Sequence, residues 1–480
     1  MVPDRATFPA PIDLMACKTT LSPENLVALG ADKLAQLILD EAEGNAPFRK
    51  RVRAALAGTK GSQAVAALID RRLAALEKAR AMVAWEKERA FAADLDATVE
   101  TITKELAGLD AIAAVQRLLR FIDTHGGVFN RIDDSGGRIQ DVYWRASEAV
   151  AGLVGRLSPG DRARVPDWLL VSLSRDTHGL AGRIAIAVAP LLPETVLAEW
   201  DRALRKADGD GDGILAIRQA IADARGDLDL YLALELQRAD WRQNPLRAAE
   251  KLLAANRLDE ALSWVRRERK SGVAYATEAD LADGRINRLH DADRVALEAR
   301  IMEAMGDRPA AQALRWAAFE ATLHVPTLRD YLRKLEDFIE YEEQERAFGV
   351  VEAFRHPYVA LAFFVEWPRL DRAAMMVLAK RSQWDGRHYD VLGEAAAALE
   401  EKFPLAATVL YRALLNDILA RAKSPAYGHG ARHLAKLEAL AGWIADWDGL
   451  ENHVTYTLGL RKAHGRKIGF WSVVEGKVRR

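Results

Sequence analysis

The sequence predicts an all-α protein in which antiparallel helix pairs stack as an α-solenoid, preceded by an N-terminal helical domain. Apolar residues recur at helical spacing, and no segment of a strand's length convincingly alternates apolar with polar residues. Between about residues 246 and 419 a short pattern also recurs: a helical stretch, a tight polar turn, then small alanines and a large ring on a second helix. Alanines let two helices approach closely and the ring fills the gap between neighbouring pairs, as in helical repeats.

The recurring pattern is clearest in the segments KLLAANRLDEALSWVRR, EAMGDRPAAQALRWAAFE and ALEEKFPLAATVLYRALL. Each segment joins two apolar stretches through a break and carries a Trp or Tyr on the second stretch. The residues that follow the pattern are Asn256, Arg257, Ala261, Leu262 and Trp264 in the first segment, Gly306, Asp307, Ala313, Leu314 and Trp316 in the second, and Ala406, Ala407 and Tyr411 in the third. We expect each segment to form a pair of packed helices.

Helix signals begin near the N-terminus. Ser22 is placed to cap a helix opened by Pro23, because proline needs no hydrogen-bond donor at a first helical position, and Gly30 is placed to end that helix. The next helix is expected over residues 32–42. It places three apolar side chains on one stripe: Leu34, Leu37 and Ile38.

Residues 62–107 contain no proline or glycine and carry apolar stripes at helical spacing. They predict two long helices with a break near Met82, either paired as an antiparallel hairpin or joined as one extended rod. Another helix is expected over residues 111–122. A glycine-rich, loop-like stretch follows, in which Asp133, Asp134 and Ser135 either bind a cation or phosphate or cap a helix that begins near Val142; we favour the caps.

The length of 480 residues exceeds the size at which one hydrophobic core keeps growing, so two or three packed units are expected. Residues 1–18 contain three prolines and no periodicity, which predicts a disordered or extended tail. We place an N-terminal helical domain at residues 19–195 and the helical-repeat domain at residues 196–480.

The composition is that of an ordinary globular protein, with 50% apolar and 29% charged residues. The 68 basic and 69 acidic residues nearly cancel, so no overall field favours nucleic acid or anionic lipid. The single cysteine, Cys17, excludes a disulfide framework. No apolar run of membrane-spanning length and no secretory signal occurs, so we expect a cytoplasmic protein with no membrane association.

One loop has the opening of a calcium-binding motif. Asp208, Asp210 and Asp212, followed by Gly213, alternate as D-x-D-x-D-G, and hard cations need several oxygens converging on one point. The twelfth position, where such loops carry a bidentate glutamate, is Gln219, which weakens the match. Such loops also serve as solvated linkers between helices, and we favour that interpretation while retaining calcium as the one candidate cofactor.

Histidines and basic residues gather at the C-terminus as a candidate ligand or partner surface. His429 and His433 lie one helical turn apart, the spacing of a zinc pair, but no third ligand is assignable, so packing or surface hydrogen bonding is favoured. The last twenty residues hold seven Arg or Lys against one Glu, with Phe470 and Trp471 among them. One interpretation is that the basic residues bind phosphates while the two rings stack on nucleic-acid bases. The other, which we favour, is that the two rings close the last helical pair as a cap. The further residues of this surface are His453, His464, Arg466 and Lys467.

Motifs for nucleotide binding or nucleophilic catalysis are missing: there is no phosphate-binding glycine loop with its lysine, no G-x-S-x-G and no dinucleotide fingerprint. These absences favour a protein without catalytic activity. The question of an enzyme stays open, because catalytic sites built from carboxylates leave little trace in a sequence.

Four segments carry a resemblance to a known family: CKTTLSPENLVALGADKLAQLILD, FNRIDDSGGRIQDVY, YDVLGEAAAALEEKFPLAATVLYRALLNDIL and HGRKIGFW. The chain resembles, from about Cys17 onward, a bacterial helical-repeat family catalogued as a domain of unknown function. Its C-terminal half is also similar to the tetratricopeptide-type region that follows the zinc finger in bacterial SWIM proteins, around His453 and residues 461–467. The zinc-binding cysteines are absent here. The resemblance implies a tetratricopeptide-like (TPR-like) α-solenoid and brings no catalytic residues.

The leading hypothesis is a cytoplasmic helical-repeat scaffold that binds another protein or a peptide, with no catalytic residues and no cofactor. The alternatives are nucleic-acid binding through the basic C-terminal segment and a calcium-responsive regulator that uses residues 208–213.

Overall fold

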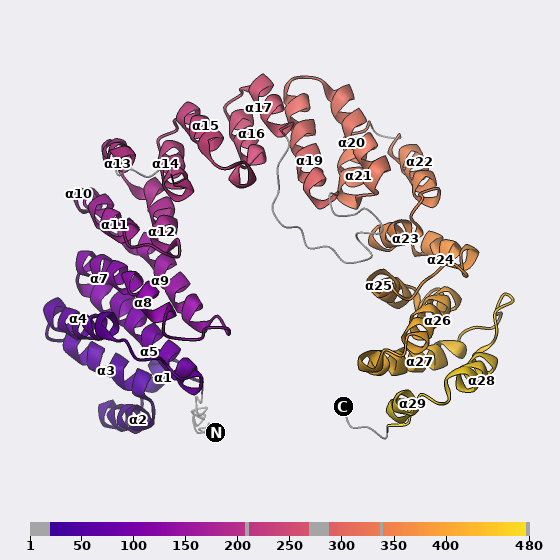
Figure 1. Cartoon of the computed structure of the whole chain (residues 1–480), viewed down its shortest axis with the longest axis horizontal. Helices are drawn as coiled ribbons and strands as arrows, with labels where there is room; N and C mark the ends of the chain where they lie inside the picture. Colours follow the sequence, from indigo (N-terminus) through magenta and orange to yellow (C-terminus); the bar gives the residue numbers. More distant parts are fainter. Residues whose placement is uncertain (1–19, 207–210, 268–287, 337–338, 477–480) are drawn as a thin grey trace, which may run out of the picture. The chain divides into compact units, whose positions relative to one another are not determined.

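The computed structural model describes residues 20–206, 211–267, 288–336 and 339–476 (Figure 1). Throughout these ranges the regular structure is helical and no strand occurs, so the predicted all-α class is confirmed. The chain divides into two compact units, residues 1–239 and 240–480. The predicted boundary at residue 195 falls inside the first unit, because Leu197, Trp200 and Leu204 of the following helix pack into its core. The predicted tail lies outside the described residues.

The first unit is a succession of helices, and the first of them begins at its predicted cap. Ser22 accepts a hydrogen bond from the Asn25 amide at 3.3 Å, as predicted. Its elements are α1 (Pro23–Val27), α2 (Ala31–Gly44), α3 (Ala46–Gly58), α4 (Ser62–Lys78), η1 (Trp85–Lys87), α5 (Glu88–Glu100), η2 (Thr101–Leu106), α6 (Ala107–Leu109), α7 (Ala111–Asp123), α8 (His125–Phe129), α9 (Arg138–Gly155), α10 (Pro159–Arg162), α11 (Val165–Leu173), α12 (Leu180–Val188), η3 (Ala189–Leu191), α13 (Glu194–Lys206), α14 (Asp212–Ala224) and α15 (Leu228–Gln237).

Residues 62–107 contain the predicted break. Helix α4 ends at Lys78 and α5 begins at Glu88, and the intervening segment is tied to residue 131, whose carbonyl accepts the Val83 amide at 2.9 Å. The alternative of one extended rod is therefore wrong. The sequence did not predict that α5 continues into η2, a stretch of π-helix, which in turn packs against α3, α4 and α7.

The glycine-rich stretch forms more helix than predicted. Glycines 126 and 127 lie within the short helix α8, and α9 begins at Arg138, earlier than the expected start at Val142. Both carboxylate oxygens of Asp134 accept amides of the first turn of α9, from Ile139 at 3.0 Å and from Gln140 at 2.8 Å. Asp134 is thus a helix cap, the interpretation that the sequence favoured.

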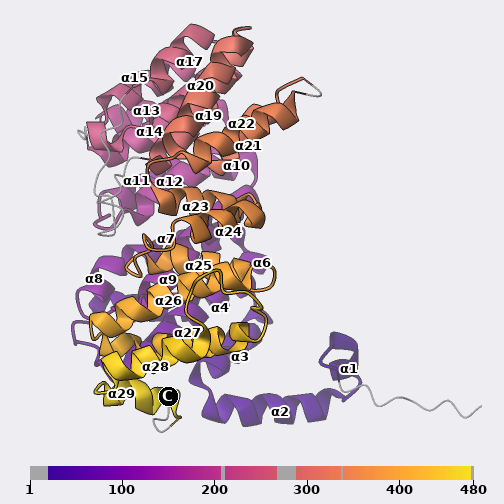
Figure 2. The same cartoon turned by 90° about the vertical axis from the view of Figure 1, so that its right-hand side faces the viewer.

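Helix α2 packs against α3 and α1 and buries little of its own surface (Figure 2). Of its residues only Ala42 is buried, while Leu37 and Ile38 of the predicted apolar stripe stay exposed. The helical periodicity was predicted correctly, but the stripe contributes almost nothing to the core.

The second unit is also a run of helices, and each packs against those adjacent in sequence (Figure 1). Its elements are η4 (Asp240–Arg242), α16 (Pro245–Ala254), α17 (Leu258–Val265), α19 (Arg288–Ala304), α20 (Arg308–Thr322), α21 (Val325–Leu332), α22 (Glu340–Glu352), α23 (Pro357–Glu366), α24 (Leu370–Ala379), α25 (Tyr389–Leu399), α26 (Pro404–Ala420), η5 (Ser424–Ala426), α27 (Tyr427–Ala441), α28 (His453–His464) and α29 (Ile468–Val474). Helices two apart also touch, since α25 contacts α23 and α26 contacts α24.

The three predicted pairs are α16 with α17, α19 with α20, and α25 with α26. Asn256 and Gly306 adopt the left-handed conformation at the turns, with φ of 57° and 88°. The rings of Trp264, Trp316 and Tyr411 are buried as expected. In the second pair the closely packed alanine is Ala311, because the predicted Ala313 faces solvent.

Candidate functional site

The predicted calcium loop lies only partly within the described residues, since residues 207–210 fall outside them. The carboxylate of Asp212 accepts hydrogen bonds from the Arg238 guanidinium at 3.2 and 3.3 Å. At the twelfth position, Gln219 is buried and donates its amide to the Glu235 carboxylate on α15. Both groups are therefore engaged in contacts between α14 and α15.

The two histidines of α27 have different surroundings. His429 is exposed, and its ring nitrogen lies 2.9 Å from the Arg432 guanidinium. His433 is half-buried, with its ring centre 5.4 Å from that of Tyr411. Burial lowers the pKa of His433 to about 4, with a smaller contribution from the neighbouring positive charges. His433 is consequently neutral at physiological pH.

His453 and His464 lie at the two ends of α28, on the face that also carries the buried Tyr456 and Leu460. The backbone carbonyl of His464 accepts the indole N–H of Trp471 at 3.0 Å. Across the parts of the chain that the structure describes, no group of three His, Cys, Asp or Glu side chains could hold a metal ion.

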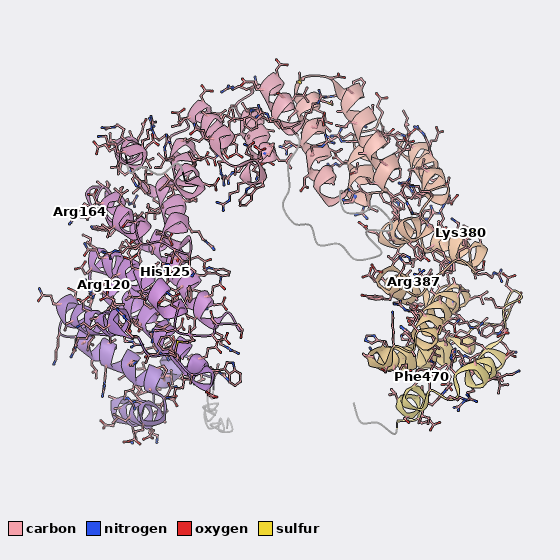
Figure 3. All side chains as sticks on the ribbon, in the orientation of Figure 1. Arg120, His125, Arg164, Lys380, Arg387 and Phe470 are labelled. Atoms are coloured by element: carbon pink, nitrogen blue, oxygen red, sulfur yellow. The ribbon has the colours of Figure 1, made fainter. Side chains whose placement is uncertain are left out.

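The aromatic residues of the basic C-terminal segment belong to the core of the second unit. Phe470, labelled in Figure 3, is completely buried, and Trp471 is 6% exposed. The Arg461 guanidinium covers the Trp471 ring at 4.4 Å from its centre. These rings close the last helices and are not accessible to a nucleic-acid base, whereas Arg466 is exposed and Lys467 is half-buried.

An exposed tryptophan that the sequence analysis did not single out lies nearby. Trp443 follows α27 and is 66% exposed, although large rings in solvent are unfavourable. It is the second residue of the loop of residues 442–452, and this loop is fixed at its far end. Arg381 donates to the Asp448 carbonyl at 2.7 Å and to its carboxylate at 2.8 Å, and Arg412 donates to the Glu451 carbonyl at 2.7 Å.

Arg412 anchors this loop from a buried position. Its guanidinium lies 4.2 Å from the centre of the Tyr456 ring and 5.3 Å from that of Trp447. Burial lowers the pKa of Arg412, which reflects the cost of placing a cation there, and the ring and carbonyl contacts offset that cost. The far end of the loop is thus held by the buried Arg412 and the exposed Arg381, while the Trp443 amide donates to the Leu440 carbonyl of α27 at 2.9 Å.

Two small pockets flank Trp443. The first, about 190 Å³, is mostly apolar and lies between the end of α24, the start of α26 and residues 443–446; its apolar walls include Leu378, Phe403 and Ile444. The second, about 170 Å³, lies between the end of α25 and α27. Both are smaller than the few hundred Å³ typical of cofactor sites, and each is of the size that accepts a single side chain.

The second pocket is acidic with one internal ion pair. Lys436 donates to the Glu400 carboxylate at 2.7 Å, and the Tyr411 hydroxyl donates to its other oxygen. Burial works against ionisation of Glu400, but these two hydrogen bonds outweigh it and lower its pKa. Glu401, also in the wall, is exposed and forms no ion pair with the described residues.

A model of a family of unknown function, DUF6880, matches residues 16–212 and 209–473. The chain belongs to this family. No curated protein and no solved structure matches it. The predicted resemblance to a family of unknown function is thus confirmed. In the described part of this DUF6880 chain, no helix is long and apolar enough to cross a membrane.

Sequence reasoning missed Trp443 because a tryptophan after a helix is usually buried, and nothing local in AGWIADWDGL distinguishes the exposed ring from Trp447 a turn later. The residues that define the pockets come from four helices and a loop. Their convergence in this DUF6880 chain depends on tertiary packing.

Proposed function

We propose that this DUF6880 chain is a TPR-like helical-repeat scaffold that binds a segment of a partner protein at Trp443. The observation that carries the proposal is the exposed indole between two side-chain-sized pockets on a fixed loop. Aromatic residues that are pre-positioned next to pockets supply much of the affinity of protein interfaces. The repeat assignment itself is supported by the succession of packed helix pairs and by the predicted similarity to the helical region of SWIM proteins.

The pockets define the chemistry of the partner. The apolar pocket accepts one medium-sized apolar side chain beside the indole. Since Glu400 is already paired with Lys436, the carboxylate that remains for a partner is Glu401. We therefore expect an extended or helical segment that carries an apolar side chain next to a Lys or Arg.

Substitution of the indole tests the proposal. Trp443→Ala removes the ring, and because the ring is mostly exposed we expect a change of no more than about 0.5 kcal/mol in the free energy of unfolding. Trp85→Ala is the matched control, since Trp85 lies in the first unit and is 68% exposed. Peptides selected from a display library by the full chain should bind the Trp443→Ala variant at least ~30-fold more weakly, as expected for a central aromatic contact.

Charge reversal tests the acidic pocket. Glu401→Lys should weaken the binding of selected peptides that contain a basic residue. Changing that basic residue of the peptide to Glu should restore binding to the Glu401→Lys variant. Peptides that bind the Trp443→Ala and Trp85→Ala variants as tightly as the original chain would place the interaction elsewhere and refute the proposal.

A further inference from the structure

The first unit contains a pocket whose walls carry four cations. It has a volume of about 260 Å³ and lies among α3, α4, α5 and the start of η2. Lys50 and Arg53 of α3 and Arg71 and Arg72 of α4 line it, together with apolar side chains such as Ile69 and with two threonines of α5 and η2. Lys50, Arg53 and Arg71 are exposed at the rim and Arg72 is half-buried, so four positive charges converge on one partly apolar hollow.

Few carboxylates compensate these cations. Asp94 pairs with both Lys50 and Arg72. The Arg53 guanidinium forms no ion pair or hydrogen bond with the described residues. The Arg71 guanidinium donates only to the Ala67 carbonyl among them, at 3.2 Å. One carboxylate therefore pairs with two of the four cations, and the side chains of Arg53 and Arg71 pair with no carboxylate of the described residues.

Two acids on the helices that line the pocket, one on α4 and one on α5, are engaged with other cations. Asp70, adjacent to Arg71 in sequence, accepts hydrogen bonds from Arg117 at 2.7 Å and from Arg120 at 3.1 Å; Arg120 is labelled in Figure 3. Glu100 pairs with Arg51 at 3.1 Å and with Lys104 at 2.8 Å. These carboxylates do not relieve the positive charge of the pocket.

The electrostatic cost is visible in the individual groups. Burial, followed by the charges of Arg72 and Arg49, lowers the pKa of Lys50. Burial and the charge of Arg131 lower the pKa of Arg72. The Nε–H group of Arg72 is also enclosed and lacks a hydrogen-bond partner among the described residues. An anion in the pocket would relieve this repulsion.

The opposite wall is irregular helix. The hydroxyls of Thr98 and Thr101 donate to the carbonyls of Asp94 and Ala97 at 2.9 and 2.8 Å, and the π-helix η2 begins at Thr101. Hydrogen bonds from serine and threonine hydroxyls to the carbonyl one turn earlier often bend helices. π-helical turns are rare overall, and those that occur are often found at functional sites.

We propose that this pocket binds a small organic phosphate monoester, with the phosphate on Arg53 and Arg71 and a compact apolar group against Ile69 and its neighbours. Guanidinium groups bind phosphate and carboxylate oxygens in pairs, and a monoester carries about two negative charges at neutral pH, which matches the surplus of cations better than a monocarboxylate does. The pocket and Trp443 lie in different units, so this proposal is independent of the scaffold function.

Calorimetric titration of the full chain with phenyl phosphate tests the proposal, with inorganic phosphate and benzoate as comparison probes. We expect saturable binding of phenyl phosphate, and weaker binding of each comparison probe. Neither arginine pairs with a carboxylate of the described residues, so Arg53→Gln/Arg71→Gln should fold normally and lose about tenfold or more in affinity.

The matched control is Arg164→Gln/Arg202→Gln, which removes two exposed cations elsewhere in the same unit, one in the turn before α11 and one on α13. The control should bind phenyl phosphate like the original chain. No saturable binding at millimolar phenyl phosphate, equal losses in the two double variants, or equal affinity for inorganic phosphate would overturn the proposal.

Discussion

Replacing glycine by alanine should change the free energy of unfolding in opposite directions at two positions of the second unit. Gly386 lies in the turn before α25, and Gly393 lies within that helix. A Cβ at Gly386 would be 2.5 Å from the Ala413 carbonyl oxygen and 2.6 Å from the Cβ of Asp417 on α26. A Cβ at Gly393 would meet nothing within 4 Å.

The turn at Gly386 cannot move away easily. The indole N–H of Trp384 donates to the Val377 carbonyl at 3.0 Å, and the Tyr358 hydroxyl accepts the Asp385 amide at 2.9 Å. The ring of His388 stacks on that of Tyr358 with 3.8 Å between centres. Because the turn is held on both sides, the Gly386→Ala methyl must displace the α26 backbone by roughly 1 Å to reach ordinary contact distances.

We therefore expect Gly386→Ala to lower the free energy of unfolding by about 3 kcal/mol, at the upper end for an overpacked site. Gly393→Ala should raise it by about 0.5 to 1 kcal/mol through helix propensity. Chemical denaturation, with hydrogen exchange of α25 and α26 to assign the change to this region, measures both. Similar values for the two variants, or a stabilised Gly386→Ala protein, would refute the packing argument.

Two further predictions concern the C-terminal helices. Phe470→Ala should cost about 3 to 5 kcal/mol, because the ring is fully buried and contacts the rings of Tyr427 and Trp471, whereas Ile468→Ala on the same helix, 75% exposed, should cost no more than about 0.5 kcal/mol. Faster hydrogen exchange of α27 and α29 in the Phe470 variant alone checks this. For His433, the pKa is 6.5 in the unfolded state and about 4 in the folded state, so the unfolded state takes up the proton first as the pH falls. The free energy of unfolding should therefore decrease by about 3 kcal/mol as the pH is lowered from 6.5 to 4. His433→Gln should flatten that part of the pH profile, and an unchanged profile would contradict the assigned burial.

Local chemistry explains what could be predicted from the sequence. The cap at Ser22, the break near Met82 and the turn at Gly306 depend on residues close in sequence, and the structure places all three as expected. The exposure of a stripe does not follow from periodicity: Leu37 and Ile38 of the predicted stripe on α2 are exposed.

The candidate sites depend on contacts between distant segments and were not predicted. Lys50 and Arg72 converge through Asp94, and each lies on a different helix. One sequence signal was available, since the stretch FRKRVR in α3 has no acidic residue to neutralise it. The π-helix that begins at Thr101 follows α5 without a proline or glycine, so no local residue marks it in the sequence.

The two proposed sites differ in how their charges are balanced, and this difference separates them experimentally. At Trp443 the half-buried carboxylate of Glu400 is already paired, so a partner gains most of its affinity from apolar contact. At the cationic pocket the side chains of Arg53 and Arg71 pair with no carboxylate of the described residues, so the affinity for an anion there should be mainly electrostatic. Raising the salt concentration from about 0.15 M to 1 M shortens the screening length from ~8 Å to ~3 Å. It should weaken phenyl phosphate binding strongly, whereas peptide binding at Trp443 should lose only the contribution of the exposed Glu401 carboxylate and keep its apolar part.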